Sequence, residues 1–166
     1  MTRWIFRITI VVAVFALGFW AWTVFFPGPE QKIRKRLTEL AQAASIAPNE
    51  APAARFLNAQ RLANFFAQNA EITVDLPGRL VRTFNSRQEI TEAATAARAM
   101  LSSLKVEFVD ITVSVASDKQ SADARLTVKA NVPGESTPEV EELKIGFTNN
   151  AGDWLIHRAE TVKILR

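Results

Sequence analysis

Residues 8–26 form the longest apolar stretch of the chain, because nineteen consecutive positions carry no charged side chain. A helix rises about 1.5 Å per residue, so this stretch would reach about 28 Å, close to the roughly 30 Å hydrocarbon thickness of a bilayer. Pro27 and Pro29 would end the helix, since proline lacks an amide hydrogen and clashes with the preceding turn. We expect residues 1–29 to be an N-terminal membrane anchor with one transmembrane helix.

A cleaved signal peptide is the alternative interpretation of this segment. Arg3 and Arg7 would supply its basic start. The apolar run is longer than the stretch of about 7 to 15 residues that is usual in a signal peptide. The bulky Phe25 and Phe26 also stand where cleavage needs small residues. These features favour an uncleaved anchor.

The pattern beyond the anchor first has the spacing of amphipathic helices. Apolar residues recur every three or four positions over residues 30–45 and 53–68, separated by a linker at 46–52. A third helix follows Ser86, whose spacing to Glu89 predicts a capping box between the two side chains and the two backbone amides. The predicted buried stripes are Ile33, Leu37, Leu40 and Ala44; Phe56, Ala59, Ala63 and Phe66; and Ile90, Ala94, Ala97 and Leu101.

From Leu104 onward the apolar period changes to two, which is the period of strands with one buried face. Strands are predicted over residues 105–116, 122–132, 139–148 and 154–165, with a shorter pair at 71–76 and 79–84. Helices followed by a run of strands indicate an α+β domain. We therefore expect residues 30–166 to fold as one domain, with three helices packed on the apolar face of an antiparallel sheet.

Two segments resemble those of a known superfamily. The closing phrase GDWLIHR, residues 152–158, and the segment FLNAQRLANFFAQNAEITV, residues 56–74, are similar to segments of the nuclear transport factor 2-like superfamily, in its polyketide-cyclase and ketosteroid-isomerase-like branches. The order of predicted elements resembles that superfamily over residues 30–166. The resemblance implies a cone, in which a curved sheet wraps the helices around an apolar pocket. It also implies a homodimer that pairs through the outer face of the sheet, which is polar in this chain.

Charge adds one local feature to this picture. The net charge is only +3, and the basic residues are scattered apart from Lys32, Arg34, Lys35 and Arg36, so no nucleic-acid partner is expected. This membrane-proximal basic cluster is either a solvated helix face or a contact with anionic lipid. The short basic N-terminus favours a cytoplasmic N-terminus, whereas the count of cations after the anchor favours the opposite orientation. We expect a single-pass protein of the bacterial inner membrane with its C-terminal domain in the periplasm.

Candidate acid–base residues are few. Asp75 and Asp110 lie on predicted strands and could point into the cone, and His157 is the sole histidine. One histidine and no cysteine exclude a multi-histidine or thiolate metal site, and we expect neither a metal nor another cofactor. Ketosteroid isomerase-like enzymes use a tyrosine in their oxyanion hole, and this chain has no tyrosine.

These observations leave two hypotheses about function. The first is a membrane-anchored, non-catalytic domain that serves interaction or assembly, or binds a small apolar ligand, with the lipid bilayer and envelope proteins as partners. The alternative is an isomerase, cyclase or hydratase of the ketosteroid-isomerase-like type acting on an apolar substrate, with Asp75, Asp110 and His157 as its residues. The second hypothesis needs at least two of these three side chains to converge within hydrogen-bonding reach.

Overall fold

The computed structural model describes residues 28–75, 81–134 and 137–162. The predicted transmembrane segment at 8–26 lies outside these ranges. Within them, no helix is long and apolar enough to cross a bilayer.

The described elements follow the predicted order. Two helices come first, α2 (Pro29–Ala44) and α3 (Pro52–Ala63), followed by the short pair β1 (Phe66–Val74) and β2 (Arg82–Phe84). The third helix is α4 (Arg87–Met100). Four long strands complete the domain: β3 (Lys105–Val115), β4 (Ser121–Asn131), β5 (Glu139–Asn150) and β6 (Asp153–Thr161). The α+β class of the domain is thus confirmed.

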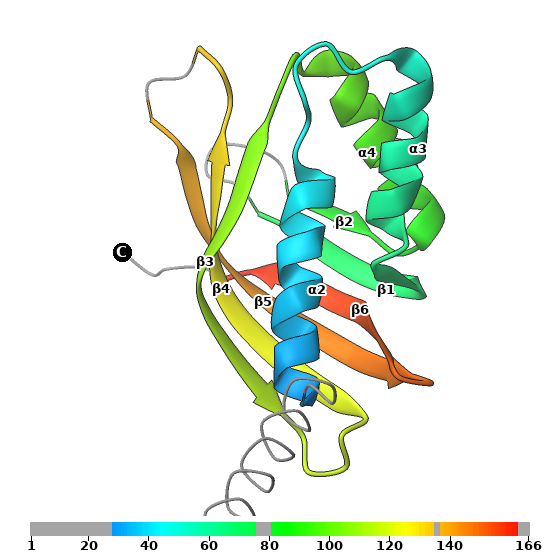
Figure 1. The fold of residues 1–166 in the computed structure, drawn as a ribbon, viewed down its shortest axis with the longest axis vertical. Coiled ribbons are helices and arrows are strands. Elements are labelled where there is room, and N and C mark those ends of the chain that lie inside the picture. The colour runs from blue at the N-terminus through cyan, green and yellow to red at the C-terminus, as the bar shows by residue number, and fades with distance from the viewer. Residues whose placement is uncertain (1–27, 76–80, 135–136, 163–166) are drawn as a thin grey trace, which may run out of the picture.

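All six strands belong to one curved sheet with the order β2-β1-β6-β5-β4-β3 (Figure 1). Neighbouring strands are antiparallel with one exception, because β1 and β6 run parallel. The prediction of a purely antiparallel sheet is therefore wrong at this pair. A hairpin forces its two strands to be antiparallel, but β1 and β6 are separated by most of the domain, so their direction is free of that constraint.

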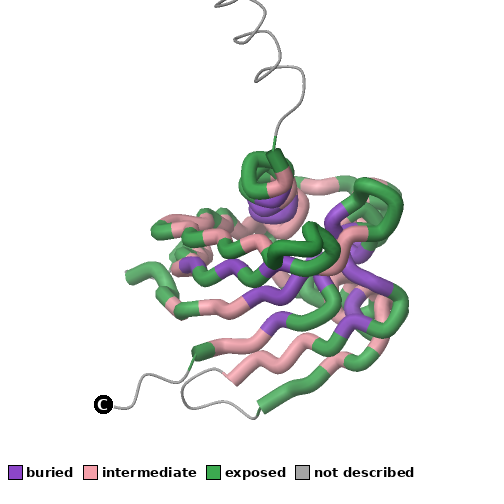
Figure 2. The backbone as a smooth tube through the Cα atoms, turned by 90° about the horizontal axis from the view of Figure 1, so that it is seen from below, coloured by how far each residue is buried: buried purple, intermediate pink, exposed green. Residues whose placement is uncertain are grey.

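The helices cover the sheet in two places. Helix α2 lies across its face, where Ile33 and Leu37 are completely buried, whereas α3 and α4 pack against each other. Figure 2 shows the buried residues gathered on the central strands and on the side of α2 that faces them. Phe147, Ile145 and Ile156 are the largest fully buried side chains of those strands. Side chains therefore fill the inner face of the sheet beneath α2.

Two predicted helical stripes differ from the structure. Helix α3 ends at Ala63 rather than continuing to residue 68, and Phe66 begins β1, where it lies in register with Ile156 of β6. Pairing with β6 overrides the helical spacing of the sequence at this point. Phe56, predicted to be buried in the same stripe, is 51% exposed. In α4 the predicted Ala97 is exposed and its neighbour Arg98 is buried.

The start of α4 confirms most of the predicted capping box. The Ser86 hydroxyl accepts a hydrogen bond from the Glu89 amide at 3.2 Å. The Glu89 carboxylate reaches back, but it accepts from the amide of Asn85 at 2.8 Å rather than from that of Ser86. Both bonds satisfy amides that have no partner inside the helix.

Loss of this cap should be measurable. We expect Ser86→Ala to lower the free energy of unfolding by about 1 kcal/mol, because the Glu89 amide loses its acceptor. Ser86→Asp, which keeps an acceptor oxygen, and Ser102→Ala in the exposed loop after α4 should both stay close to the parent protein. Urea unfolding followed by circular dichroism provides the measurement. A Ser86→Ala curve that overlays the parent curve would contradict the role given to the cap.

Candidate functional site

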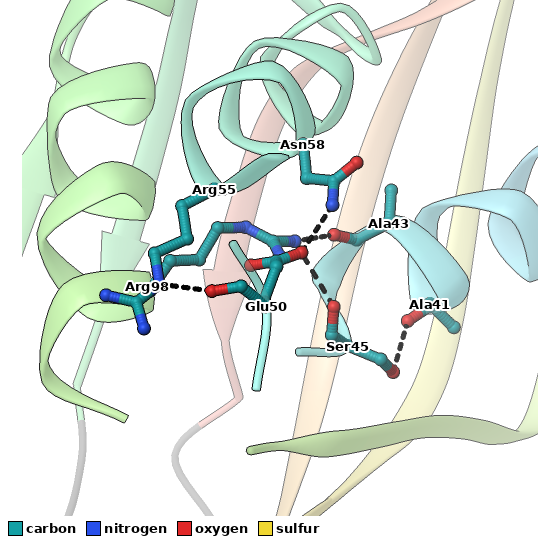
Figure 3. Close-up of polar contacts among 7 residues, drawn as sticks. All are labelled: Ala41, Ala43, Ser45, Glu50, Arg55, Asn58 and Arg98. Atoms are coloured by element: carbon teal, nitrogen blue, oxygen red, sulfur yellow. Dashed lines mark hydrogen bonds and ion pairs between the residues drawn. The ribbon is translucent and has the colours of Figure 1, made fainter. Parts of the chain in front are cut away.

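Arg98 of α4 is the most deeply buried charged residue among the described residues, at 2% exposure. Its Nη1 donates to both carboxylate oxygens of Glu50, at 3.0 and 3.1 Å (Figure 3). The side chains of Arg98 and Glu50 are 3% and 7% exposed. Because Glu50 lies between α2 and α3, this buried ion pair ties α4 to the connection between the two preceding helices.

Hydrogen bonds from two other helices, α2 and α3, complete the network around the pair. The Nη2 of Arg98 donates to the backbone carbonyls of Ala43 and Ser45, which lie at the end of α2 and have no partner within the helix. Asn58 of α3 donates to the Glu50 carboxylate, and Arg55 Nε donates to the Glu50 carbonyl at 3.0 Å. Both buried charges are thereby paired and hydrogen-bonded, which is the condition for keeping charges in a protein interior.

The chain that follows α2 is also fixed to the sheet. The hydroxyl of Ser45 donates a hydrogen bond to the Ala41 carbonyl at 2.9 Å and accepts one from the Val106 amide of β3 at 3.0 Å. The next residue, Ile46, exchanges two backbone hydrogen bonds with Leu104, at 2.8 and 3.0 Å. The end of α2, the linker and the start of β3 therefore form one rigid corner.

A pocket of about 640 Å³ opens at this corner, between α2, α3, α4 and the start of β3. We call it the helix-junction pocket. Its apolar lining includes the buried Phe65 and Ile46 together with Leu104, and its buried polar lining is the Arg98–Glu50 pair. The exposed cations Arg61 and Lys105 lie among its outer residues.

The two outer cations are not equivalent. Lys105 Nζ lies 2.7 Å from the Glu107 carboxylate, and this hydrogen bond and charge hold the pKa of Glu107 below its usual value. Arg61 makes no hydrogen bond or ion pair with any residue that the structure describes. Arg61 is therefore the cation at this pocket that is available to a bound anion.

The three predicted acid–base residues lie apart from this pocket and from one another. Asp75 follows the end of β1, and its amide donates to Thr161 Oγ1 of β6 at 3.0 Å. Asp110 is exposed at a bulge of β3 with a φ of 53°, and it borders a groove of about 510 Å³ on the sheet. His157 is exposed at a bulge of β6, and its ring lies against Gly146.

Strand spacings give the separation of these residues. Three strand spacings of about 4.8 Å put Asp110 roughly 14 Å from β6. Asp75 lies next to Thr161, four positions along β6 from His157, or about 13 Å at 3.3 Å per residue. The structure does not bring any two of the three within hydrogen-bonding reach.

The basic cluster of α2, predicted to lie near a membrane, contains two kinds of residue. Arg34 donates to the Ile111 carbonyl of β3 at 2.8 Å and pairs with Glu30 at 3.0 Å. The guanidinium of Arg36 lies over the Phe65 ring, 4.7 Å from its centroid. These two residues hold α2 in place, whereas Lys32 and Lys35 are exposed.

Sequence reasoning missed the buried pair. Arg98 stands four residues after Ala94 and eight after Ile90, so it continues the buried stripe of α4 at helical spacing. A charged residue within a predicted buried stripe indicates a buried ion pair, but it does not identify the residue that carries the opposite charge. Glu50 lies in a linker whose path depends on tertiary contacts.

Comparisons with known proteins identify the fold. Neither a protein-family model nor a curated protein matches the chain. Among solved structures, an NTF2-like protein of unknown function from Pseudomonas putida is 13% identical with a TM-score of 0.61, covering 82% of this chain and 87% of that one. An NTF2-like protein with a cystatin-like fold from Novosphingobium aromaticivorans is 19% identical with a TM-score of 0.60, covering 80% and 79%. A candidate scytalone dehydratase from the same species is 13% identical with a TM-score of 0.60, covering 81% and 84%. The described domain therefore has the nuclear transport factor 2-like fold.

The buried pair makes a strong prediction about stability. Glu50→Ala leaves the Arg98 guanidinium buried without its counter-charge, so we expect the free energy of unfolding to fall by about 3–5 kcal/mol. The double variant Glu50→Leu/Arg98→Met contains no buried charge and should recover much of that loss. Urea unfolding of both variants measures the difference.

Arg158→Ala is the matched control, because it breaks the exposed pair with Glu160 and should lower the free energy of unfolding by less than about 1 kcal/mol. A double variant as unstable as the sum of its single substitutions would contradict the interpretation of Arg98 and Glu50 as one unit.

Proposed function

We propose that this protein is a membrane-anchored, non-catalytic domain that binds a small, largely apolar ligand in the helix-junction pocket. The observation that carries the proposal is the contrast between two regions of the domain. The inner face of the sheet beneath α2 is filled by side chains such as Phe147 and Leu37. The corner between the helices instead remains open, with apolar and polar groups side by side.

The placement of the candidate acid–base residues argues against catalysis. A general base must lie within about 2.6–3.2 Å of the proton that it removes, and it usually needs an orienting partner. Asp110 and His157 are exposed on separate strands, and Asp75 lies at a third position. The Arg98 guanidinium is occupied by Glu50 and by two carbonyls.

An enzymatic role remains the second candidate, because a candidate scytalone dehydratase shares the fold. An isomerase, cyclase or hydratase would require a rearrangement that brings two of Asp75, Asp110 and His157 together.

The residues of the pocket indicate the class of ligand. Phe65, Ile46 and Leu104 offer apolar contact area. Arg61 offers an unpaired guanidinium, which binds carboxylates through two parallel hydrogen bonds. These features suit an apolar ring system or short chain that carries one carboxylate.

Anchoring would confine this binding to the membrane surface. The apolar run at 8–26 ends three residues before α2 begins at Pro29, so a transmembrane helix there would hold the domain directly at the lipid headgroups. We place the anchor in the bacterial inner membrane and the domain in the periplasm. Envelope proteins, or a second copy pairing through the polar outer face of the sheet, would be its partners.

Ligand binding can be tested with 2-naphthoate and its uncharged analogue 2-naphthalenemethanol. We expect 2-naphthoate to raise the melting temperature of the full chain in nanodiscs. Arg61→Gln should weaken its binding by roughly tenfold, because a charge-assisted hydrogen bond is lost, and should leave the alcohol unaffected. Arg125→Gln, which removes an exposed cation bordering the sheet groove, is the matched control and should change the binding of neither compound. A melting temperature that neither compound moves would favour a protein–protein role instead.

The side of the membrane can be tested with a reporter fused after Arg166. We expect alkaline phosphatase at this position to be active in bacterial cells and green fluorescent protein to be dark. Alkaline phosphatase becomes active only in the periplasm, whereas green fluorescent protein that is exported by the general pathway does not become fluorescent. The positive-inside rule gives this outcome if Arg3 and Arg7 stay in the cytoplasm. The opposite pattern would place the domain in the cytoplasm and would show that Lys32 to Arg36 determine the orientation.

A further inference from the structure

A second, smaller pocket lies where α2 meets the turn between β5 and β6. Its volume is about 290 Å³, and we call it the α2 notch. Three cations of α2 line it, Lys32, Lys35 and Arg36, and the turn contributes Gly152, Asp153 and Trp154. Glu39 completes the lining. Three positive and two negative side chains give the notch a net charge of +1.

The cations of the notch lack strong partners. Lys32 has no ion pair or hydrogen bond to any residue in the described ranges. Lys35 Nζ lies 3.9 Å from Glu39, and its side chain is 79% exposed, so that contact contributes little. Arg36 Nη1 lies 4.0 Å from the same carboxylate. The carboxylate of Glu39 is thus shared between Lys35 and Arg36, and it is in close contact with neither.

Arg36 also carries an unsatisfied donor. Its Nε is buried and has no hydrogen-bond partner among the described residues, while the guanidinium carbon lies over the Phe65 ring. A buried N–H without an acceptor is costly and rare in native proteins. An anion with several acceptor oxygens, bound between Arg36 and the two lysines, would supply that acceptor and neutralise the excess charge.

The helical spacing explains why these residues act together. Positions 32, 35 and 36 are related by three and four residues, so their side chains are neighbours on one side of α2. The neighbouring positions Ile33 and Leu37 are buried against the sheet and fix the rotation of the helix. The notch is therefore a preorganised feature of the fold, and its volume suits one compact tetrahedral group better than an extended polyanion.

The place of the notch along the chain indicates the source of the anion. Lys32 lies about 4.5 Å and Arg36 about 10 Å from the start of α2 along its axis. If α2 follows an anchor at 8–26, which is part of the function proposed above, Lys32 would lie about 9 Å and Arg36 about 15 Å beyond the apolar run, and their long side chains would extend toward the lipid phosphates from just outside the headgroup layer. We propose that the α2 notch binds the phosphate of an anionic lipid headgroup.

Lysine footprinting tests this proposal on the full chain. The protein is placed in nanodiscs of neutral phosphatidylcholine, or of phosphatidylcholine with phosphatidylglycerol, and is treated with an amine-acylating reagent. Mass spectrometry then gives the acylation rate of each lysine. Nanodiscs leave both faces of the bilayer open to the reagent, so the orientation of the chain does not affect the result.

We expect Lys32 and Lys35 to react about fivefold more slowly in the anionic nanodiscs, because each basic side chain is attracted to an anionic surface. Lys129 and Lys144 on the sheet are the internal controls and should react at equal rates in both. The protection should disappear near 1 M salt, where the screening length is about 3 Å. Arg36→Met should reduce it, whereas Arg125→Gln, on the sheet, should not.

Two outcomes would overturn the proposal. Equal rates at Lys32 and Lys35 in neutral and anionic nanodiscs would exclude a lipid site. Protection by inorganic phosphate in neutral nanodiscs, as strong as that by phosphatidylglycerol, would make the notch a site for free phosphate. Flotation of the full chain with liposomes measures membrane attachment independently of lysine protection. It therefore distinguishes a chain that has no anchor from an anchored chain whose α2 notch does not bind lipid.

Discussion

The ion pair between Arg98 and Glu50 determines how the helices of this domain are arranged. Helices α3 and α4 have narrow apolar faces, and α3 leaves Phe56 and Leu57 exposed. The Arg98 guanidinium of α4 joins this helix to the end of α2 and to the linker at the same time, and Arg87 joins the start of α4 to the Phe66 carbonyl of β1. An apolar residue at position 98 would pack between the helices, but it would make no directional bond that fixes the course of the linker. The charges favour the observed path, because it supplies acceptors to both terminal nitrogens of Arg98.

The Arg98–Glu50 ion pair also explains why the helix-junction pocket exists. Hydrophobic contacts between α2 and the sheet fill the inner face beneath α2, since apolar side chains pack without regard to direction. The helix corner is held by directional bonds instead, and these leave space beside them. The described domain is thus filled beneath α2, where most of its apolar core lies, and open beside its buried charges.

Sequence reasoning succeeded where structure is determined locally. The alternation from Ala122 to Val128 and the cap at Ser86 both depend on near neighbours, and both were predicted. It failed where distant segments decide. Phe66 has helical spacing in the sequence, but its pairing with Ile156 makes it a strand residue. Glu50 and Arg98 are 48 positions apart, so no local pattern could join them. The candidate residues Asp110 and His157 were placed on strands correctly, but bulges in β3 and β6 decide their final positions.

The position of β6 in the sheet has a consequence for synthesis of the protein. The last strand of the chain is not an edge strand: it lies between β1 and β5 and joins two parts that share no other strand pairing. Until its residues leave the ribosome, β1 and β5 each present an unpaired edge, which is the kind of surface that recruits foreign strands. A nascent chain therefore cannot close the sheet before β6 has been synthesised. Until then, β1 and β5 are open to strand pairing with other chains, which is a route to aggregation.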